Sequence, residues 1–217
     1  MRLIKFVLIV VIFSFCSVPG LIYSANQSQS GNKLFGIAGT ESPEAHEYPG
    51  LQCYIYKNYI IHAIPSVSVG QEIKVFGKLG TDFAKAQCNM PDRRTWLYIK
   101  NRDAHWFAGI SGDYLFIDNG TAPDGREVIV YNIAKKKKIF RSKYLETFSV
   151  KDKNTVSYYA GKRKIRSILE CPETERTDEL KEWLTKGGSV ALAEQTIVNL
   201  SSLKKRSTGK FRCVALQ

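Results

Sequence analysis

Apolar and polar residues alternate along much of the chain after residue 50, and this alternation predicts β-strands. The segment LQCYIY at 51–56 places Cys53 on one face and Tyr54 on the other. A Lys-Asn turn follows, and YIIHAI at 59–64 is predicted to return as the second strand of a hairpin. EIKVF at 72–76 adds a further strand, so this part of the chain favours antiparallel pairing.

Strand-like segments continue through the middle of the chain. Those between residues 94 and 159 are rich in β-branched and aromatic residues: RTWLYI, HWFAGI, YLFID, REVIVYNI, KKIFRS and TVSYYA. Turn residues separate them at close, even spacing, which predicts an antiparallel meander. Two more strands are predicted at 189–200, where the first half also fits a helix, and at 210–217. The predicted fold is therefore mainly β, a meander that forms a sandwich, a curved sheet or a partial propeller-like array.

One segment breaks the strand pattern and predicts a short α-helix at about 177–186, with the sequence TDELKEWLTK. Thr177 is suited to cap its start, and two acidic residues follow in the first turn. Leu180, Trp183 and Leu184 share one face at helical spacing, and Gly187 is placed to end the helix. We expect Trp183 to pack against the sheet.

The stretch SGDYLFIDNGTAPDGREVIVYNIAKKKKIF, within residues 111–141, resembles one blade of the β-propellers of the TolB and WD40-like families. In such blades a strand ends in a polar turn, the next strand carries a pattern like IxVYD, and a turn with Lys or Gly leads to the outer strand. Tyr114–Asp118, Glu127–Asn132 and Ile139–Arg141 take those places here. A propeller needs at least about four blades of about 40 residues, and we find no second copy of the pattern. No whole-chain family is recognised.

The first residues have the layout of a secretory signal peptide, with Arg2 and Lys5 before a short apolar core. A retained anchor is the alternative, but the core is short for a membrane span, which needs about 20 residues. We predict cleavage between Gly20 and Asn26, and therefore a signal peptide at 1–25. A polar, flexible leader at 26–35 and a single disulfide-bonded β-rich domain at 36–217 are predicted to follow.

Four cysteines remain once the signal peptide is removed, and an even number in an exported chain predicts two disulfides. Four cysteines allow three connectivities. Pairing neighbours in sequence predicts Cys53–Cys88 and Cys171–Cys213, and the alternative is four separate buried thiols. The chain has no CxxC motif, so neither a thioredoxin-like redox site nor a structural zinc site is indicated.

Candidate chemistry is sparse, and the sequence predicts no catalytic residue, no metal and no cofactor. Glu44, His46 and Glu47 could hold a metal with His62 as partner, but adjacent loop residues rarely converge. Asp103 and His105 could form an activating pair, yet no GxSxG elbow supplies a nucleophile. Asp118, Asn119 and Asp124 could bind calcium, but their spacing does not match an EF-hand, and a hairpin loop explains them equally well.

Positive charge is concentrated between Lys135 and Arg166, where twelve basic residues face two acidic ones. Removal of the signal peptide lowers the formal net charge from +12 to +10, so this stretch alone accounts for the net charge of the mature chain. The candidate anion-binding residues are Lys135, Lys136, Lys137, Lys138, Arg141, Lys143, Lys162, Arg163, Lys164 and Arg166. We expect Lys135–Lys138 and Lys162–Lys164 to form two hairpin tips. The alternative interpretation is a solvated surface that keeps sheet edges from pairing.

These features predict an exported, non-enzymatic binding protein of the cell envelope or extracellular space, periplasmic or secreted. Its basic β-hairpin surface would bind an anionic partner, such as lipid headgroups, lipopolysaccharide or a wall polymer, or a protein. Export argues against nucleic acid, and no transmembrane segment is expected after cleavage. One alternative is an exported inhibitor of an envelope-attacking enzyme such as lysozyme, with the acidic stretch at 170–182 as its contact. Another is a hydrolase that uses Asp103 and His105.

Overall fold

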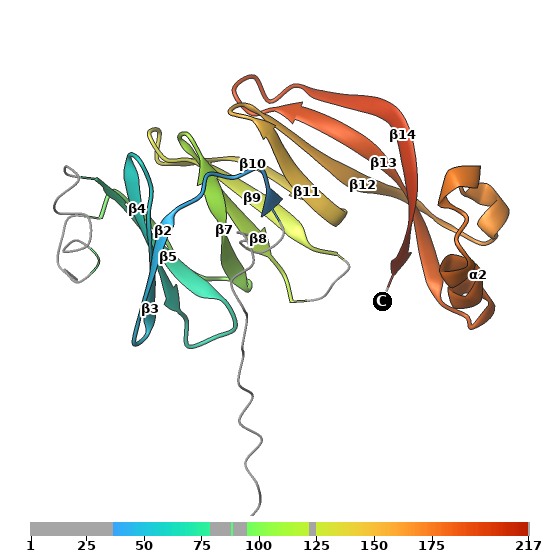
Figure 1. Cartoon of the computed structure of the whole chain (residues 1–217), viewed down its shortest axis with the longest axis horizontal. Coiled ribbons are helices and arrows are strands. Elements are labelled where there is room, and N and C mark those ends of the chain that lie inside the picture. Colours follow the sequence, from blue (N-terminus) through green and yellow to red (C-terminus); the bar gives the residue numbers. More distant parts are fainter. Residues whose placement is uncertain (1–36, 79–87, 89–94, 122–124, 217) are drawn as a thin grey trace, which may run out of the picture. The chain divides into compact units, whose positions relative to one another are not determined.

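The structure, a computed structural model, describes residues 37–78, 88, 95–121 and 125–216 (Figure 1). The predicted signal peptide at 1–25 and leader at 26–35 lie outside the described residues. The described chain is mainly β, with three antiparallel-rich sheets and one short α-helix, which confirms the predicted fold class. No helix in the described part is long and apolar enough to span a bilayer.

The first sheet, here called the N-terminal sheet, is an antiparallel meander in which each strand pairs with the next. Its strands are β2 Glu44–Tyr48, β3 Leu51–Ile55, β4 Tyr59–Pro65, β5 Gln71–Gly77 and β6 Leu97–Ile99. Sequence reasoning placed β2 in a polar loop, and that interpretation was wrong. As an edge strand with largely exposed side chains, β2 lacks the apolar alternation that identifies a strand.

The second sheet, here called the central sheet, contains the segment that resembles a propeller blade. Its strands are β7 His105–Ser111, β8 Tyr114–Asn119, β9 Glu127–Asn132 and β10 Lys137–Lys143, in a four-stranded antiparallel meander. The expected strand–turn–strand succession is therefore present locally. Over the described residues the sheets form neither a closed barrel nor a propeller.

The third sheet, here called the C-terminal sheet, contains the longest strands. Its members are β1 Ile37–Ala38, β11 Leu145–Asp152, β12 Thr155–Ile165, β13 Ser189–Asn199 and β14 Lys205–Leu216. The two-residue strand β1 adds to β11 in parallel, whereas the other pairs are antiparallel. The strand predicted at 189–200 is confirmed, since β13 is strand throughout and the alternative helix is absent from it, whereas β11 was not predicted.

The central sheet is buried on both faces, and this arrangement creates two cores. Leu115 and Ile117 of β8 pack with residues of the N-terminal sheet, including Ile61, Ile73 and Val75. The alternate residues Tyr114 and Phe116 pack with residues of the C-terminal sheet, including Phe148, Val156 and Tyr158. Burial of both faces explains why β8 reads as a continuous apolar run.

The helix α2 spans Asp178–Thr185 and follows two 3₁₀ turns, η1 at Ile168–Glu170 and η2 at Glu173–Glu175. The Thr177 hydroxyl accepts a hydrogen bond from the Leu180 amide at 3.3 Å, which confirms the predicted N-cap. Leu180 and Leu184 pack around the Cys171–Cys213 disulfide. Trp183 is 37% exposed, and its indole N–H donates to the carbonyl of Ser189 at the start of β13.

Both predicted disulfides are present. Cys53 on β3 is bonded to Cys88, and Cys171 after η1 is bonded to Cys213 on β14. All four cysteines are buried, with at most 5% of any side chain exposed. Two disulfides indicate an oxidising, extracytoplasmic compartment, because thiols in the cytosol are kept reduced.

A glycine fixes the close approach of the N-terminal and central sheets. Gly70 has φ +108, and a Cβ there would lie 2.8 Å from both the amide nitrogen and the carbonyl oxygen of His105. We predict that Gly70→Ala lowers the free energy of unfolding by about 2–4 kcal/mol, because backbone strain and overlap act together. Urea unfolding monitored by circular dichroism measures the loss.

Gly50→Ala is the matched control for this substitution. Gly50 also has a positive φ, +73, but a Cβ there would meet no atom within 4 Å. It should therefore cost only about 1 kcal/mol, the backbone strain alone. Equal losses in the two variants would show that the contact with His105 does not hold the sheets together.

Candidate functional site

Hairpin turns from all three sheets lie together at one end of the strands. Alternate turns of an antiparallel meander lie at the same end of its strands. The turns are 57–58, 112–113, 133–136, 153–154 and 200–204. The Tyr59 hydroxyl donates to the Asp113 carboxylate at 2.6 Å, and the Ile133 amide donates to the Asp113 carbonyl at 2.8 Å. The Leu200 amide donates to the Asn154 carbonyl at 2.7 Å. Figure 1 shows these turns along the upper edge of the view, and we call this surface the turn face.

A small pocket links the turns of the three sheets. Its volume is about 380 Å³, and its lining includes Lys57, Tyr59, Gly112 and Lys153. The aliphatic stem of Lys153 lies over Gly112, where an added Cβ would be 2.9 Å from the lysine Cε. Glu41 accepts a hydrogen bond from the Gly112 amide in the same place. The turn face is therefore one connected surface.

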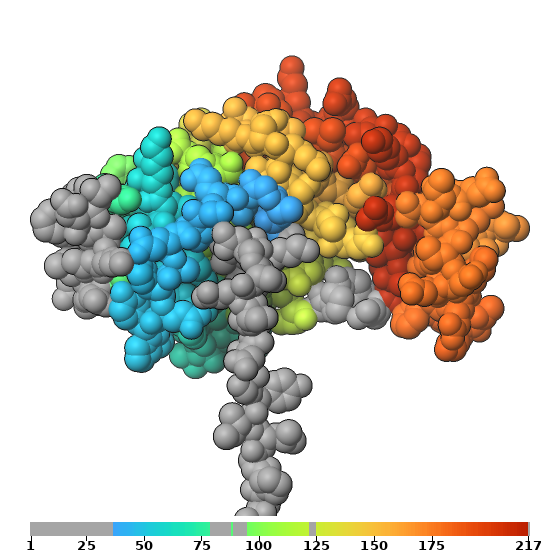
Figure 2. All heavy atoms as spheres, in the orientation of Figure 1, coloured from blue at the N-terminus to red at the C-terminus, as the bar shows by residue number. Residues whose placement is uncertain are grey.

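Lysine side chains dominate the turn face. Eight exposed lysines lie in these turns or at the strand residues beside them: Lys57, Lys135, Lys136, Lys137, Lys138, Lys153, Lys204 and Lys205. Within the described part of the chain, none of the eight takes part in an ion pair. Figure 2 shows the atoms of these turns along the upper surface of the view. Their charges are therefore available to an external partner.

The three acidic residues at the turn face, Glu41, Asp113 and Asp152, accept hydrogen bonds from the turns themselves. Glu41 accepts from the Gly112 amide and Asp113 from the Tyr59 hydroxyl. Asp152 accepts from the Asn154 amide at 2.9 Å, and hydrogen bonds from that backbone lower the pKa of its carboxyl. These carboxylates shape the turns and do not neutralise the lysines by direct pairing.

The predicted hairpin tip is present between β9 and β10, with Lys135 and Lys136 in the turn and Lys137 and Lys138 as the first residues of β10. Asn132 fixes the turn, because its side-chain oxygen accepts a hydrogen bond from the Lys135 amide at 2.8 Å. The Lys136 ammonium lies 4.4 Å from the centroid of the Trp96 ring, in a cation–π contact. The Trp96 indole donates to the Ile133 carbonyl at 3.2 Å, so the tip is held against the N-terminal sheet.

Arg141 and Lys143, two further candidates, lie toward the other end of β10. Arg141 forms an ion pair with Glu127 at 2.6 Å. Lys143 pairs in register with the same Glu127 on β9. Neither residue belongs to the turn face, because both lie toward the other end of β10, away from the turn between β9 and β10.

The predicted second tip at Lys162–Lys164 does not exist. These residues lie within strand β12, where Gly161 and Arg163 flank a register shift. The irregularity at this position is a β-bulge within the strand and not a turn. Lys162 pairs with Glu194 at 2.6 Å, and Arg163 pairs with Glu170.

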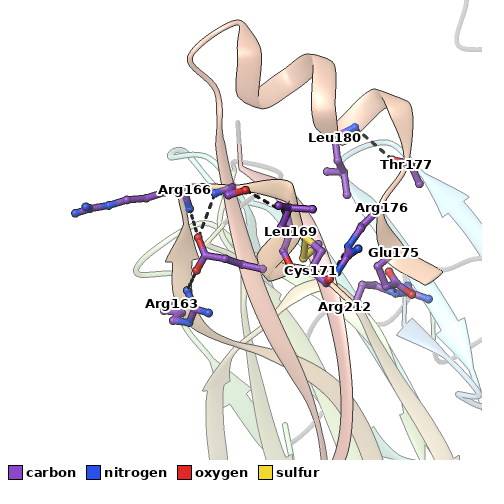
Figure 3. The surroundings of a disulfide bond; sticks show 12 residues. Arg163, Arg166, Leu169, Cys171, Glu175, Arg176, Thr177, Leu180 and Arg212 are labelled. Atoms are coloured by element: carbon purple, nitrogen blue, oxygen red, sulfur yellow. Dashed lines mark hydrogen bonds and ion pairs between the residues drawn. A yellow bond between two sulfur atoms is a disulfide. The ribbon is translucent and has the colours of Figure 1, made fainter. Parts of the chain in front are cut away.

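Figure 3 shows Arg163 and Arg166 in the surroundings of the Cys171–Cys213 disulfide. One carboxylate oxygen of Glu170 accepts from the amide of Arg166 at 2.8 Å. The guanidinium of Arg166 extends away from this cluster. The basic residues of β12 therefore lie beside the acidic segment that follows them, away from the lysines of the turn face.

The acidic stretch at 170–182 is largely committed to contacts within the chain. Glu175 reaches Arg212 at 3.6 Å, and the Asp178 and Glu182 carboxylates pair with Lys181 and Lys186. Fewer free carboxylates remain for a basic partner than the sequence suggests. The geometry thus adds no support to the alternative of a lysozyme inhibitor.

Asp103 and His105 do not form the pair that a hydrolase would need. Asp103 is exposed, whereas His105 is 6% exposed, and no hydrogen bond joins their side chains. His105 Nδ1 is buried without a partner among the described residues, and burial lowers the pKa of the imidazole. The backbone of His105 lies against Gly70 of the turn between β4 and β5.

The four residues considered as metal ligands are not brought together. His46 contacts Glu44 at 3.0 Å, and Cys53 lies between His46 and His62 in the strand register. His62 is buried beside the Cys53–Cys88 disulfide, and burial lowers its pKa to about 4. Because both sulfur atoms are in the disulfide, they offer no thiolate to a metal.

The loop residues considered for calcium also have other roles. Asp118 is fully buried, accepts a hydrogen bond from the Tyr144 hydroxyl at 2.9 Å and pairs with Arg126. Asn119 donates to Glu127 at 3.2 Å. Asp124 lies outside the described residues.

Sequence reasoning found four of the eight turn-face lysines and missed Lys57, Lys153, Lys204 and Lys205. Lys57 and Lys153 are isolated lysines in turns, and Lys204 and Lys205 belong to the short basic run at 204–206, outside the basic stretch at 135–166. The signal in the sequence that could have identified these four lysines was their position relative to the predicted turns. Each lies in or beside a turn that joins two strands of a meander, and alternate turns of a meander share an edge.

Comparisons with protein-family models, with curated proteins and with solved structures find no match to this chain.

The ion pair between Arg163 and Glu170 should make the stability of the fold depend on pH. Hydrogen bonding to Arg163, the largest cause, and to the Arg166 backbone lowers the pKa of Glu170 to about 2. A folded-state pKa below the unfolded value of 4.5 stabilises the fold above about pH 4.5, and the effect is lost as the pH falls toward 2. We predict that Arg163→Gln raises the Glu170 pKa toward 4.5, as measured by NMR titration of the carboxyl carbon.

Arg166→Gln serves as the control, because Arg166 contacts Glu170 through its backbone amide and not through its side chain. The Glu170 pKa should stay low in that variant. A rise of the same size in both variants would mean that general surface charge, and not the Arg163 contact, sets the pKa.

Proposed function

We propose that this protein is an exported, non-enzymatic binding protein of the cell envelope or extracellular space, periplasmic or secreted, and that the turn face binds an anionic partner. The observation that carries the proposal is the convergence of eight exposed lysines, without ion pairs in the described chain, from turns of all three sheets. Two supporting observations are the signal-peptide layout of the first residues and the two disulfides.

The magnitude of the electrostatic effect suits a multivalent anionic surface. Each basic residue near an anionic membrane surface contributes roughly 1 kcal/mol, and the attraction falls off within about 10 Å at moderate salt. A single lysine would therefore bind too weakly, whereas several lysines on one face can act together. Lipid headgroups, lipopolysaccharide and acidic wall polymers all present repeated anionic groups of this kind.

The proposed contact surface differs from the ten residues suggested by the sequence. Lys135–Lys138 remain at its centre, and Lys57, Lys153, Lys204 and Lys205 join them. Arg141, Lys162 and Arg163 are engaged in ion pairs, which reduces the charge they could offer. The remaining three candidates, Lys143, Lys164 and Arg166, lie on strands or loops away from the turns.

A charge-removal experiment tests the proposal. We predict that replacing Lys135, Lys137, Lys153 and Lys204 by Ser weakens binding of the mature chain to anionic phosphatidylglycerol vesicles and to lipopolysaccharide by at least about tenfold. The reason is that roughly 1 kcal/mol is lost with each contacting lysine. Cosedimentation at low and at physiological salt measures the affinity.

The control variant removes the same number of positive charges elsewhere, with Lys100, Lys164, Arg166 and Lys210 replaced by Ser. These four residues are exposed and form no ion pair with a described residue. Equal binding by the two variants would show that net charge, and not the turn face, sets the affinity. Failure of the unaltered protein to bind either anionic surface at physiological salt would refute the proposal.

A further inference from the structure

A second pocket lies at the edge opposite the turn face, where the turn between β4 and β5 approaches strand β7. Its volume is about 490 Å³, within the range of roughly 300–1,000 Å³ that is usual for small-molecule sites. Its lining includes Glu47, Gln52, Ser66, Gln71 and Trp106. No basic residue of the described chain lines it.

A chain of buried hydrogen bonds fixes one wall of this pocket. Gln71 is 5% exposed, and its side-chain oxygen accepts from the Phe107 amide at 3.0 Å. Because a backbone N–H can only donate, this contact sets the orientation of the Gln71 amide. The nitrogen of that amide then donates to the side-chain oxygen of Gln52 at 3.0 Å.

Hydrogen bonds also set the orientation of the Gln52 side-chain amide. Its oxygen accepts from Gln71 and also from the Tyr54 hydroxyl at 3.2 Å. The amide nitrogen of Gln52, which carries two hydrogens, has no partner in the described chain. The pocket wall therefore carries an oriented hydrogen-bond donor, held by residues of both the N-terminal and the central sheet.

The turn between β4 and β5, which contributes Ser66, Ser68 and Gly70 to the lining, is equally constrained. Asn101 is 7% exposed, and its side-chain nitrogen donates to the Ser68 hydroxyl at 3.1 Å and to the Val69 carbonyl at 2.7 Å. Its oxygen accepts from the His105 amide at 2.9 Å. Gly70 packs directly against the His105 backbone. The turn that borders the pocket is thus tied down, and the pocket is preformed.

The chemistry of the lining points to a neutral ligand rich in hydroxyl groups. Glu47 pairs with Gln52 in the β2–β3 register, so an acceptor carboxylate and a donor amide lie side by side. A hydroxyl group can donate to the first and accept from the second, whereas an anion would be repelled by Glu47 and would meet no positive charge. The Trp106 indole offers an aromatic surface to the C–H face of a ring.

We propose that this pocket binds one ring of a neutral carbohydrate. Glu47 and Gln52 would bind adjacent hydroxyl groups, and Trp106 would contact the apolar face of the sugar ring. The proposal is independent of the turn face, because the two sites share no residue and use opposite chemistry. An exported protein of this kind would hold a glycan at one edge and an anionic surface at the other.

The mature chain can be titrated with trisaccharides of glucose, mannose and N-acetylglucosamine, with tryptophan fluorescence and saturation-transfer NMR as readouts. We expect at least one of them to bind with a dissociation constant below about 1 mM. Glu47→Gln should weaken that binding by about tenfold, because the hydrogen bond from the sugar hydroxyl then has a neutral amide oxygen as its acceptor and not a charged carboxylate. Trp106→Ala should abolish it.

Val67→Ser is the control, since Val67 lies on the same turn, is fully exposed and does not line the pocket. It should bind as the unaltered protein does. Glu47 is exposed, so Glu47→Gln reports on binding even if Trp106→Ala fails to fold. Absence of binding to all three trisaccharides, or unchanged binding in Glu47→Gln, would overturn the proposal. The turn-face lysine variant should keep its sugar binding, which separates the two hypotheses.

Discussion

The four-stranded sheet of β7 to β10 has apolar side chains on both faces, and the rest of the fold serves to cover them. Leu115 and Phe116 are adjacent in sequence and fully buried, yet they belong to different cores. A sheet buried on both sides needs an apolar layer against each face. The N-terminal sheet supplies one layer and the C-terminal sheet supplies the other. The positions of the turns, and so of the proposed sites, follow from this packing.

Both faces of the central sheet are buried, so its polar side chains are exposed to solvent mainly at the two ends of its strands, where the turns lie. At one edge, turns from three sheets present lysines while nearby carboxylates are engaged with backbone amides and with Tyr59. At the other edge, two glutamine amides and an asparagine tie the turns to β7. Cations are thus concentrated at one edge, and oriented neutral polar groups line the pocket at the other. Segregation of this kind permits two unlike partners to bind without competing.

The acidic segment after β12 has a structural explanation that composition alone does not reveal. Glu170 and Glu194 pair with Arg163 and Lys162, and Glu175 reaches Arg212. These contacts surround the Cys171–Cys213 disulfide, where the packed leucines of α2 complete a small separate core. The positive charges of β12 are thus partly neutralised by the carboxylates of the residues that follow it. The lysines of the turn face form no such ion pairs with described residues, which is why the proposed contact surface lies there.

Local features of the sequence determined much of the strand content and the capped helix, through the alternation at 51–56 and the Thr177 cap. The four cysteines after residue 25 predicted the two disulfides. The edge strand β2 and the strand β11 were not predicted, because most of their side chains are at least partly exposed and show no consistent apolar period.

Only the tertiary structure decided which charges share a surface. The segment Lys162–Lys164 was expected to form a hairpin tip, but pairing with β13 places it within a strand. Lys57 and Lys204 are 147 positions apart in sequence, but their turns both belong to the turn face through the turn at 153–154. The register and packing that place them there are set by contacts between distant strands. The sequence around each lysine contains no information on those contacts.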